Sequence, residues 1–245
     1  MDGATGREGV AAAASTEGNL ALISGVIFDL DGVLVDSEIW WDEVRMTFAA
    51  THGRTWTAAD RTAVMGANSR AWSAIMRERL DLDMPEVDIE REVVRGVVER
   101  YRREGAPPID GAVDAVRRIA ARWPVAVASS AHPEVIAAAL DATGLAEVFG
   151  VVVSSDEVAH GKPSPDVYLE AARRLGLEPG SLLVVEDSRN GVLAGKAAGM
   201  TVVLVPNESI PPDAGTADLA DVVLARLADL DPARVDLAAR PAGHD

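Results

Sequence analysis

Short apolar runs recur along the chain, and each ends in polar residues or a glycine-containing turn. Uninterrupted apolar runs of this length are typical of strands buried on both faces of a parallel sheet. Between them lie segments whose apolar positions repeat with the helical period. We predict strands at residues 20–30, 124–130, 148–155, 181–185, 201–205 and 221–224, and helices at residues 111–122, 133–143, 164–175 and 188–199.

This alternation predicts βαβ units, right-handed crossovers and a parallel sheet. We therefore expect an α/β fold with a Rossmann-like, doubly wound core. Residues 38–105 interrupt the alternation, because they contain helical periodicities and no convincing strand. The predicted division is a core of residues 20–37 and 106–233, an all-helical cap of residues 38–105, a disordered lead-in of residues 1–19 and a tail of residues 234–245.

Most of the large aromatic side chains lie in this helical insert. It holds four of the five tryptophans, Trp40, Trp41, Trp56 and Trp72. Because side chains of this size are mostly buried, we expect most of them to pack in the insert's own core. One of them could instead line a pocket that faces the functional site.

Composition and charge exclude several classes of function. The 245 residues contain no cysteine, which rules out disulfides, thiolate metal sites and a cysteine nucleophile. The formal net charge of −16 disfavours binding to nucleic acid or to an anionic membrane, since both need a basic surface. No apolar run approaches the length of a membrane span, and residues 1–19 lack the apolar segment of a signal peptide. We expect a cytoplasmic protein, monomeric or weakly homodimeric.

Two carboxylates follow the first predicted strand at its carboxyl end. Asp29 and Asp31 are two residues apart, so their side chains point to the same side of the strand. Ionised carboxylates this close repel each other unless a cation or a proton lies between them. Oxygen ligands of this kind suit a hard cation such as Mg²⁺.

Further chemically useful side chains follow the later strands. They are Ser129, Ser130, Lys162, Glu186 and Asp187. Because the carboxyl ends of parallel strands meet at one edge of the sheet, we expect them to converge with Asp29 and Asp31. Carboxylates, hydroxyl groups and one ammonium group together suit the binding of a phosphoryl group. The ammonium group and amides at a helix start can hold its oxygens, and a metal ion can bridge it to the carboxylates.

Each of these side chains has a purely structural alternative. Ser129 and Ser130 could cap the helix that starts near Pro133. Lys162 could be a solvated loop residue, and Asp187 and Ser188 could be an N-cap pair for the helix that follows them. None of these alternatives explains why each strand end carries a different part of one phosphate site.

The segments Asp29–Glu38, Ser129, Gly161–Asp166 and Glu186–Gly191 resemble, in order, the four motifs of the haloacid dehalogenase (HAD) superfamily. The resemblance spans residues 26–205. It is to the group with a helical cap inserted after the first motif, which includes sugar-phosphate phosphatases and β-phosphoglucomutase. Four motifs in order are far more specific than any one of them alone.

The resemblance implies a role for each motif residue. Asp29 is expected to be the nucleophile that forms a phosphoaspartyl intermediate. Asp31 is expected to protonate the leaving oxygen and then to activate water, which requires a pKa raised by its acidic neighbours. The residues expected to bind the transferred phosphoryl group are Leu30, Ser129, Ser130 and Lys162.

Mg²⁺ is the cofactor that the resemblance implies. It would be held by the carboxylate of Asp29, the main-chain carbonyl of Asp31 and the carboxylate of Asp187, with Glu186 assisting. Metal and lysine would offset the charge on the phosphoryl group, and electrostatic positioning carries most of the catalysis of phosphoryl transfer.

Within this superfamily the sequence favours a phosphatase for a small, sugar-like phosphomonoester. The dehalogenases lack the second aspartate, Asp31, and the insert has no lysine of the kind that phosphonate hydrolases use to form an imine. Trp41, Asn68 and Arg70 are the cap residues that we expect to shape substrate choice.

Two alternatives remain. A β-phosphoglucomutase-like enzyme would use Arg70 to bind a second phosphate, but Trp41 replaces the histidine that those mutases carry there. A catalytically weak protein that binds a phosphorylated metabolite or a partner ranks lower, because no residue of the four motifs is missing.

Overall fold

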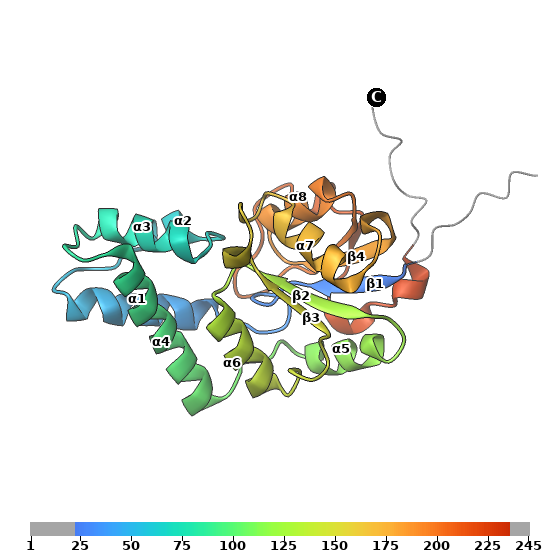
Figure 1. The fold of residues 1–245 in the computed structure, drawn as a ribbon, viewed down its shortest axis with the longest axis horizontal. Coiled ribbons are helices and arrows are strands. Elements are labelled where there is room, and N and C mark those ends of the chain that lie inside the picture. Colours follow the sequence, from blue (N-terminus) through green and yellow to red (C-terminus); the bar gives the residue numbers. More distant parts are fainter. Residues whose placement is uncertain (1–22, 236–245) are drawn as a thin grey trace, which may run out of the picture.

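A computed structural model describes residues 23–235 of the chain. The lead-in of residues 1–19 and the tail from residue 236 onward lie outside this range, so those two predictions stay untested. Within it, six strands form one parallel sheet in the order β3-β2-β1-β4-β5-β6 (Figure 1). The strands are β1 (Gly25–Phe28), β2 (Val125–Ser129), β3 (Val151–Ser154), β4 (Leu182–Glu186), β5 (Thr201–Leu204) and β6 (Val222–Val223).

The sheet grows outward from β1 in both directions, which confirms the doubly wound α/β fold that the sequence predicts. Successive side chains of β1 enter different cores: Val26 and Phe28 belong to one hydrophobic cluster and Ile27 to the other. The helices that supply these two clusters are α5 (Ala112–Ala120) and α6 (Pro133–Thr143) on one face, and α7 (Asp166–Leu175) and α8 (Arg189–Ala197) on the other.

The clearest agreement between predicted and observed bounds is at α6, because local residues fix both of its ends. Pro133 occupies its first turn, and Gly144 takes the left-handed conformation, φ 66°, that ends it. Strands β1 and β3 are shorter than predicted. The chain leaves β1 at Asp29 and turns back through Gly32, whose φ is 83°, and residues before 151 form a turn after α6 instead of the start of β3.

Four helices lie between β1 and α5, beyond the carboxyl ends of the strands (Figure 1). They are α1 (Glu38–Thr51), α2 (Ala58–Val64), α3 (Ser69–Arg79) and α4 (Glu86–Glu104). The two connections to the core run side by side, since the amide of Asp36 donates to the carbonyl of Pro107 at 2.9 Å. Helix α4 also packs against α6. The assignment of this insert as a separate domain stays a prediction.

The aromatic side chains of the insert pack in the hydrophobic cluster that also holds Val26 and Phe28 of the sheet, and not in a separate core of the insert. Trp41, Trp56 and Trp72 are buried, and the rings of Trp41 and Trp72 meet edge to face with their centroids 6.2 Å apart. Trp40 is half-buried against Tyr101. Trp41 and Trp72 also line the cavity described below.

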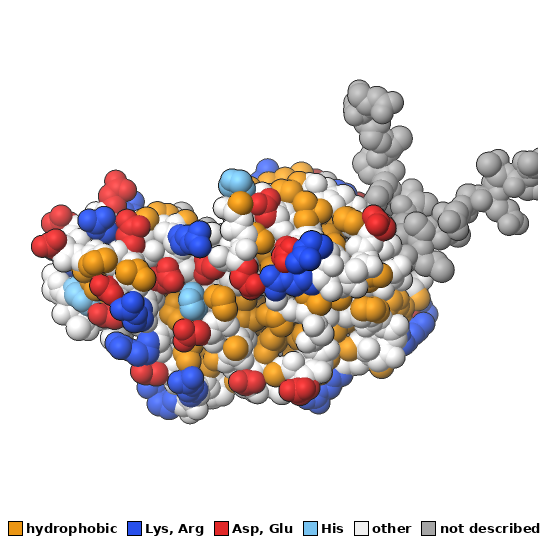
Figure 2. Space-filling view, in the orientation of Figure 1, with side chains coloured by type: hydrophobic (Ala, Val, Ile, Leu, Met, Phe, Trp, Pro, Cys, Tyr) orange, Lys and Arg blue, Asp and Glu red, His pale blue; other side chains and the backbone are white. Residues whose placement is uncertain are grey.

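None of the helices in residues 23–235 is long and apolar enough to cross a membrane. Acidic and basic side chains are interspersed on the face drawn in Figure 2, over the insert as well as the core. The acidic excess of the sequence is therefore spread out on this face, with no continuous basic patch there.

The packing of the sheet predicts a contrast between two valines. Val184 lies fully buried in β4 at the centre of the sheet, whereas Val223 in the edge strand β6 is 47% exposed. Val184→Ala should lower the free energy of unfolding by about 2 kcal/mol through lost burial and a residual cavity. Val223→Ala should cost less than about 0.5 kcal/mol. Urea unfolding measures both, and equal losses would contradict this assignment of the core.

Candidate active site

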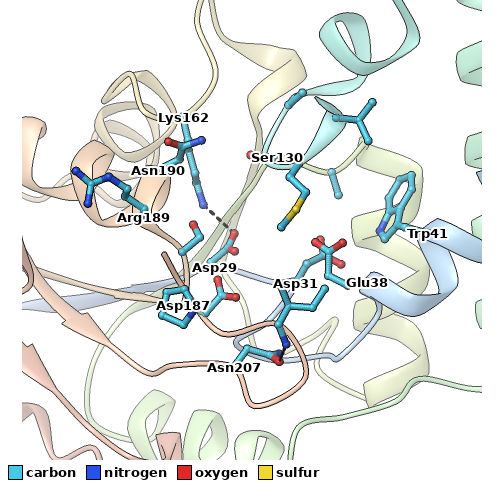
Figure 3. Close-up of a pocket in the computed structure, with 18 of the residues that line it drawn as sticks. Asp29, Asp31, Glu38, Trp41, Ser130, Lys162, Asp187, Arg189, Asn190 and Asn207 are labelled. Carbon is cyan, nitrogen blue, oxygen red and sulfur yellow. Dashed lines mark hydrogen bonds and ion pairs between the residues drawn. The ribbon is translucent and has the colours of Figure 1, made fainter. Parts of the chain in front are cut away.

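The strand ends place a lysine and three carboxylates together at one edge of the sheet. Asp29 directly follows β1, Glu186 ends β4 with Asp187 next to it, and Lys162 reaches in from the loop between β3 and α7. In Figure 3, Asp29, Asp187 and Lys162 lie on one side of a cavity. Three segments far apart in the sequence therefore meet at the site, in the arrangement that their strand-end positions predict.

Lys162 is the central group of this cluster. Its ammonium donates to Oδ1 of Asp29 at 2.8 Å, to Oε1 of Glu186 at 2.7 Å and to the carbonyl oxygen of Ala128 at 3.1 Å. Burial by itself would lower the pKa of Lys162, but the carboxylates of Asp29 and Glu186 raise it well above its ordinary value. The side chain is therefore a permanent buried cation, and the solvated-loop alternative is wrong.

Glu186 is fully buried, and both oxygens of its carboxylate accept hydrogen bonds from protein groups. Oε1 also accepts the hydroxyl of Tyr168 at 2.7 Å, and Oε2 accepts the amides of Asp187 and Ser188 at 3.0 and 3.1 Å. Burial opposes ionisation, yet Lys162 and these donors keep the pKa of Glu186 below its ordinary value. Glu186 therefore holds Lys162 and the β4–α8 turn in place, and its oxygens are less free than those of its neighbours.

Asp29 and Asp187 carry the carboxylate oxygens that remain open. Burial raises the pKa of Asp29 to about 7, against the opposing effect of Lys162, and Glu186 raises it further. Burial and the charges of Glu186 and Asp29 likewise raise the pKa of Asp187. One ammonium does not neutralise three carboxylates, so ionising both Asp29 and Asp187 would add uncompensated negative charge, and their raised pKa values reflect this.

The cluster has the donors and the spacing that a hard cation requires. Oxygens of Asp29, Glu186 and Asp187 lie within 4.8 Å of one another, and carboxylate oxygens are the ligands that Mg²⁺ takes. Gly32 leaves room for Asp187, because a Cβ on Gly32 would come within 2.0 Å of Oδ2. The residues present therefore fit a divalent metal.

Asp31 lies apart from this cluster, toward the insert. Its carboxylate accepts a hydrogen bond from the hydroxyl of Ser37. The pKa of Asp31 is raised, in the direction expected of a proton donor, but the cause is burial. The expected cause, repulsion by acidic neighbours, is not among the main causes of this shift, and in Figure 3 Asp31 lies beside Glu38, apart from Asp187.

Ser129 and Ser130, at the end of β2, do not cap α6, which was the structural alternative for these two residues. The N-cap of α6 is His132, whose Nδ1 accepts the amide of Glu134. The hydroxyl of Ser129 instead accepts the amide of Ala131 at 3.0 Å. Ser129 and Ser130 both line the cavity, while Leu30 is fully buried beneath it. Ser188, by contrast, caps α8 as the alternative proposed.

A cavity of about 360 Å³ opens between the strand ends and the insert. The core contributes Asp29, Asp31, Lys162, Asp187 and the segment 188–190, and the insert contributes side chains from α1, α2 and α3. Part of the wall comes from residues 207–213 after β5. The volume is at the small end of ligand pockets, which suits a small molecule.

Of the three predicted cap residues, only Trp41 lines this cavity. Asn68 instead caps α3, where Oδ1 accepts the amide of Ala71 at 3.1 Å. Arg70 is exposed on the following turn. The structure therefore does not bring Asn68 or Arg70 to the cavity wall, because the short loop that carries them faces the core through other groups, such as the amide of Ser69, which donates to Asp156.

The polar residues of the wall that sequence reasoning did not select include Glu38, Arg45 and Asn207. Arg45 lies one helical turn after Trp41, so the spacing that singled out Trp41 could have found it. Asn207 is the first polar residue after β5, and the rule used at the other strand ends would have selected it. Its Oδ1 accepts the amides of Ser209 and Ile210, which shapes the loop over the cavity.

The fold and this carboxylate–lysine cluster define an α/β protein of the hydrolase type, and comparisons with known proteins give its family. Residues 23–199 match the haloacid dehalogenase-like hydrolases, and the chain belongs to that family. It is 33% identical over 229 residues to a probable pseudouridine-5'-phosphatase of Drosophila melanogaster, covering 90% of this chain and 96% of that protein.

Other relatives agree with this assignment. Fructose-1-phosphate phosphatase YqaB of Escherichia coli (strain K12) is 30% identical over 192 residues, covering 74% of this chain and 95% of that protein. The crystal structure of CbbY from Rhodobacter sphaeroides in complex with phosphate superposes with a TM-score of 0.73 at 26% identity, covering 85% of this chain and 96% of that chain. The chain spans 55% of the bifunctional riboflavin kinase/FMN phosphatase of Arabidopsis thaliana, with 32% identity over 211 residues.

The crowding around Glu186 predicts a sharp effect at Gly191. A Cβ there would lie 1.7 Å from Oε1 of Glu186, whereas a Cβ on Gly150 would meet no atom within 4 Å. Gly191→Ala should therefore displace the Glu186 carboxylate from Lys162 and lower the free energy of unfolding by about 3 kcal/mol. Gly150→Ala is the matched control and should stay within about 0.5 kcal/mol of wild type. Denaturant unfolding of both variants measures the difference, and a Gly191→Ala protein as stable as the control would contradict this role for Glu186.

Proposed function

We propose that this hydrolase is a Mg²⁺-dependent phosphatase that cleaves a small, sugar-like phosphomonoester through a phosphoaspartyl intermediate. The observation that carries the proposal is the 2.8 Å bond from Lys162 to Asp29, beside Asp187, at the floor of a small cavity. Two of the relatives, a probable pseudouridine-5'-phosphatase and a fructose-1-phosphate phosphatase, support both the phosphoric monoester hydrolase class and a sugar-like substrate.

Mg²⁺ would be held by the carboxylates of Asp29 and Asp187 and by the main-chain carbonyl of Asp31. Glu186 would assist from behind, since its own oxygens are occupied by Lys162, Tyr168 and backbone amides. The bound cation would neutralise charge on the phosphoryl oxygens and on the two ligating carboxylates. The raised pKa values of Asp29 and Asp187 support this assignment, because a bound cation would offset the charge that their ionisation adds.

In the first step, a carboxylate oxygen of Asp29 attacks phosphorus while the bond from phosphorus to the ester oxygen breaks. Asp31 gives its proton to the departing oxygen, so the product leaves as an alcohol. In the second step, Asp31 takes a proton from water, whose oxygen attacks the phosphorus of phosphoaspartate. The carboxylate of Asp29 is released together with inorganic phosphate.

The surrounding residues support these two steps. Lys162 and Ser129, with Ser130 and the chain at Leu30, would hold the phosphoryl oxygens. Burial keeps a proton on Asp31 at higher pH than an exposed aspartate would, which suits its first role. The insert would exclude bulk water from the cavity while leaving room for the attacking molecule.

The sequence leaves two other functions open. In the mutase, Arg70 would bind a second phosphate, but Arg70 is exposed and absent from the cavity wall. The weak binding protein depends on a deficient site, yet Asp29, Lys162 and Asp187 all line the cavity. Neither the position of Arg70 nor the composition of the site therefore favours one of these functions over the phosphatase. A cytoplasmic location and a monomeric or weakly dimeric state stay predictions.

The covalent mechanism predicts the behaviour of Asp29→Asn. The amide keeps the shape of the side chain but is a far poorer nucleophile, so release of p-nitrophenol from p-nitrophenyl phosphate should fall by at least about 10³-fold. Asp83→Asn, at an exposed position of the insert, should leave turnover within about twofold of wild type. Retained turnover in a folded Asp29→Asn protein would reject the covalent mechanism.

The raised pKa of Asp29 predicts that Mg²⁺ stabilises the protein more at high pH. A carboxyl group whose pKa rises to about 7 on folding contributes stability at low pH and loses it as pH rises through 7. Mg²⁺ binds the ionised form and compensates this loss. In thermal unfolding, saturating MgCl₂ should raise Tm by about 5 °C or more near pH 8 and by much less near pH 5.

The Asp187→Asn variant is the control for this measurement, since it removes one metal ligand and should show a much smaller shift with MgCl₂ at both pH values. A shift in wild type that is equal at the two pH values would mean that the carboxylates of this cluster do not bind the metal.

A further inference from the structure

Arg45 of α1 is a buried cation in the cavity wall. It is 7% exposed, and its guanidinium lies 4.9 Å from the ring centre of Trp41 and 5.5 Å from that of Trp72. Its Nε is buried without a hydrogen-bond partner. Among residues 23–235, no carboxylate oxygen comes within the 4.0 Å of an ion pair with it.

The other charged side chains of the insert that are buried or stacked on an aromatic ring have partners. Asp42 accepts the indole N–H of Trp56 at 2.7 Å and a guanidinium N–H of Arg61 at 2.5 Å. Arg100 lies 4.9 Å from the ring centre of Trp40, the same distance as Arg45 from Trp41, but it also forms ion pairs with carboxylates. Stacking on tryptophan therefore does not replace the donors that Arg45 leaves unused.

Burial without a partner is costly for an arginine. Its guanidinium carries five N–H donors, and desolvating a charge without hydrogen bonds costs more than stacking on an aromatic ring returns. Burial also lowers the pKa of Arg45 to about 10, and the side chain stays charged at neutral pH. A costly group that faces a ligand cavity is a candidate for binding a ligand.

Three acidic groups influence Arg45 from a distance: Glu38, Asp42 and Asp31. Both oxygens of Asp42 are already occupied. Asp31 accepts from Ser37. Glu38 is seven residues before Arg45 on the same helix, a rise of about 10 Å along the axis, and it forms no ion pair with it. None of these carboxylates therefore pairs with the N–H donors of the Arg45 guanidinium.

The position of Arg45 fits the far end of a substrate. In Figure 3, Trp41 and Lys162 lie on opposite sides of the cavity, and Arg45 is next to Trp41. The transferred phosphate of the proposed reaction would occupy the Lys162 side. The guanidinium lies over the rings of both tryptophans, which leaves its N–H edge for a ligand with two acceptor oxygens.

We propose that Arg45 binds a second anionic group of the substrate, a carboxylate or a second phosphate, at the end remote from the phosphate that is hydrolysed. This inference rests on the proposed function for the placement of the first phosphate. It makes the preferred substrate a phosphomonoester with a second oxyanion. The acceptor oxygens would pair with the N–H groups that the protein leaves free, and the second cation would help to offset the acidic net charge of −16.

A matched series of linear substrates tests this proposal. Glucitol 6-phosphate, gluconate 6-phosphate and glucitol 1,6-bisphosphate differ only at carbon 1, which carries a hydroxyl, a carboxylate or a phosphate. Glycerol 3-phosphate and glycerate 3-phosphate form a shorter pair. In phosphate-release assays with MgCl₂, wild type should favour at least one anionic member over its neutral partner by about tenfold or more in kcat/KM. The preferred member identifies carboxylate or phosphate as the bound group.

Arg45→Met keeps the length of the side chain and its contact with the tryptophans but removes the charge. Its kcat/KM for the preferred anionic member should fall by about 30-fold, mainly through KM, while the neutral partner changes less than about threefold. Arg45→Lys keeps the charge without the fork and should retain an intermediate preference. Arg100→Met is the matched control, because Arg100 stacks on Trp40 but is ion-paired. It should leave the preference for the anionic substrate unchanged.

Three outcomes would overturn the proposal. Wild type could cleave the neutral members as fast as the anionic ones. Arg45→Met could lose activity equally on all members and shift the pH–rate profile of the neutral ones, which would make Arg45 a positioning residue for Asp31. An equal loss of activity on all members together with a lower Tm would make Arg45 a packing residue. The expected result is instead a folded Arg45→Met protein with a Tm at or above that of wild type.

A binding measurement tests the anion site at Arg45 independently of the proposed phosphatase reaction. If wild type cleaves none of these compounds and not p-nitrophenyl phosphate either, the phosphatase assignment fails. Calorimetric titration of the Asp29→Asn protein with gluconate 6-phosphate, glucitol 1,6-bisphosphate and glucitol 6-phosphate still tests Arg45. Tighter binding of an anionic member, lost in the Asp29→Asn, Arg45→Met double variant, supports the anion site, and equal binding of all three contradicts it.

Discussion

The ammonium group of Lys162 lies buried between the carboxylates of Asp29 and Glu186, and the geometry of the site depends on these bonds. A lone ammonium in this position would be unstable, because burial penalises charge. Three acceptors around it, two of them carboxylate oxygens, offset that penalty. The lysine also fixes the ends of β1, β2 and β4 relative to one another. The sheet therefore positions the site residues, and their bonds to Lys162 hold the strand ends together.

The helical insert completes the site from the opposite side. Its two connections to the core are hydrogen-bonded side by side, and α4 packs on α6, so a core helix positions the insert over the strand ends. Further contacts link the two parts, such as the amide of Ser69 to Asp156 at 3.0 Å. The insert thereby places Trp41 and Arg45 opposite Lys162. One cation lies at the floor of the cavity and another in its far wall, although the chain as a whole is strongly acidic.

The fold and the core of the site could be predicted because local rules determine them. Apolar runs mark the strands, the first polar residue after a strand lies at the sheet edge, and Pro133 with Gly144 fixes α6. The cavity wall of the insert could not be predicted in the same way, because it depends on how four helices dock on the core. A short loop motif selected Arg70, which is exposed, and overlooked Arg45, whose partners are tryptophans from two different helices.

A crystal structure with MgCl₂ shows whether Lys162 and a metal share the carboxylates of one cluster. We expect one cation bound by oxygens of Asp29 and Asp187 at about 2.0–2.1 Å, with Glu186 still bonded to Lys162 and Tyr168. A cation bound away from Asp29, or a Glu186 carboxylate that leaves Lys162 to ligate the metal directly, would contradict it.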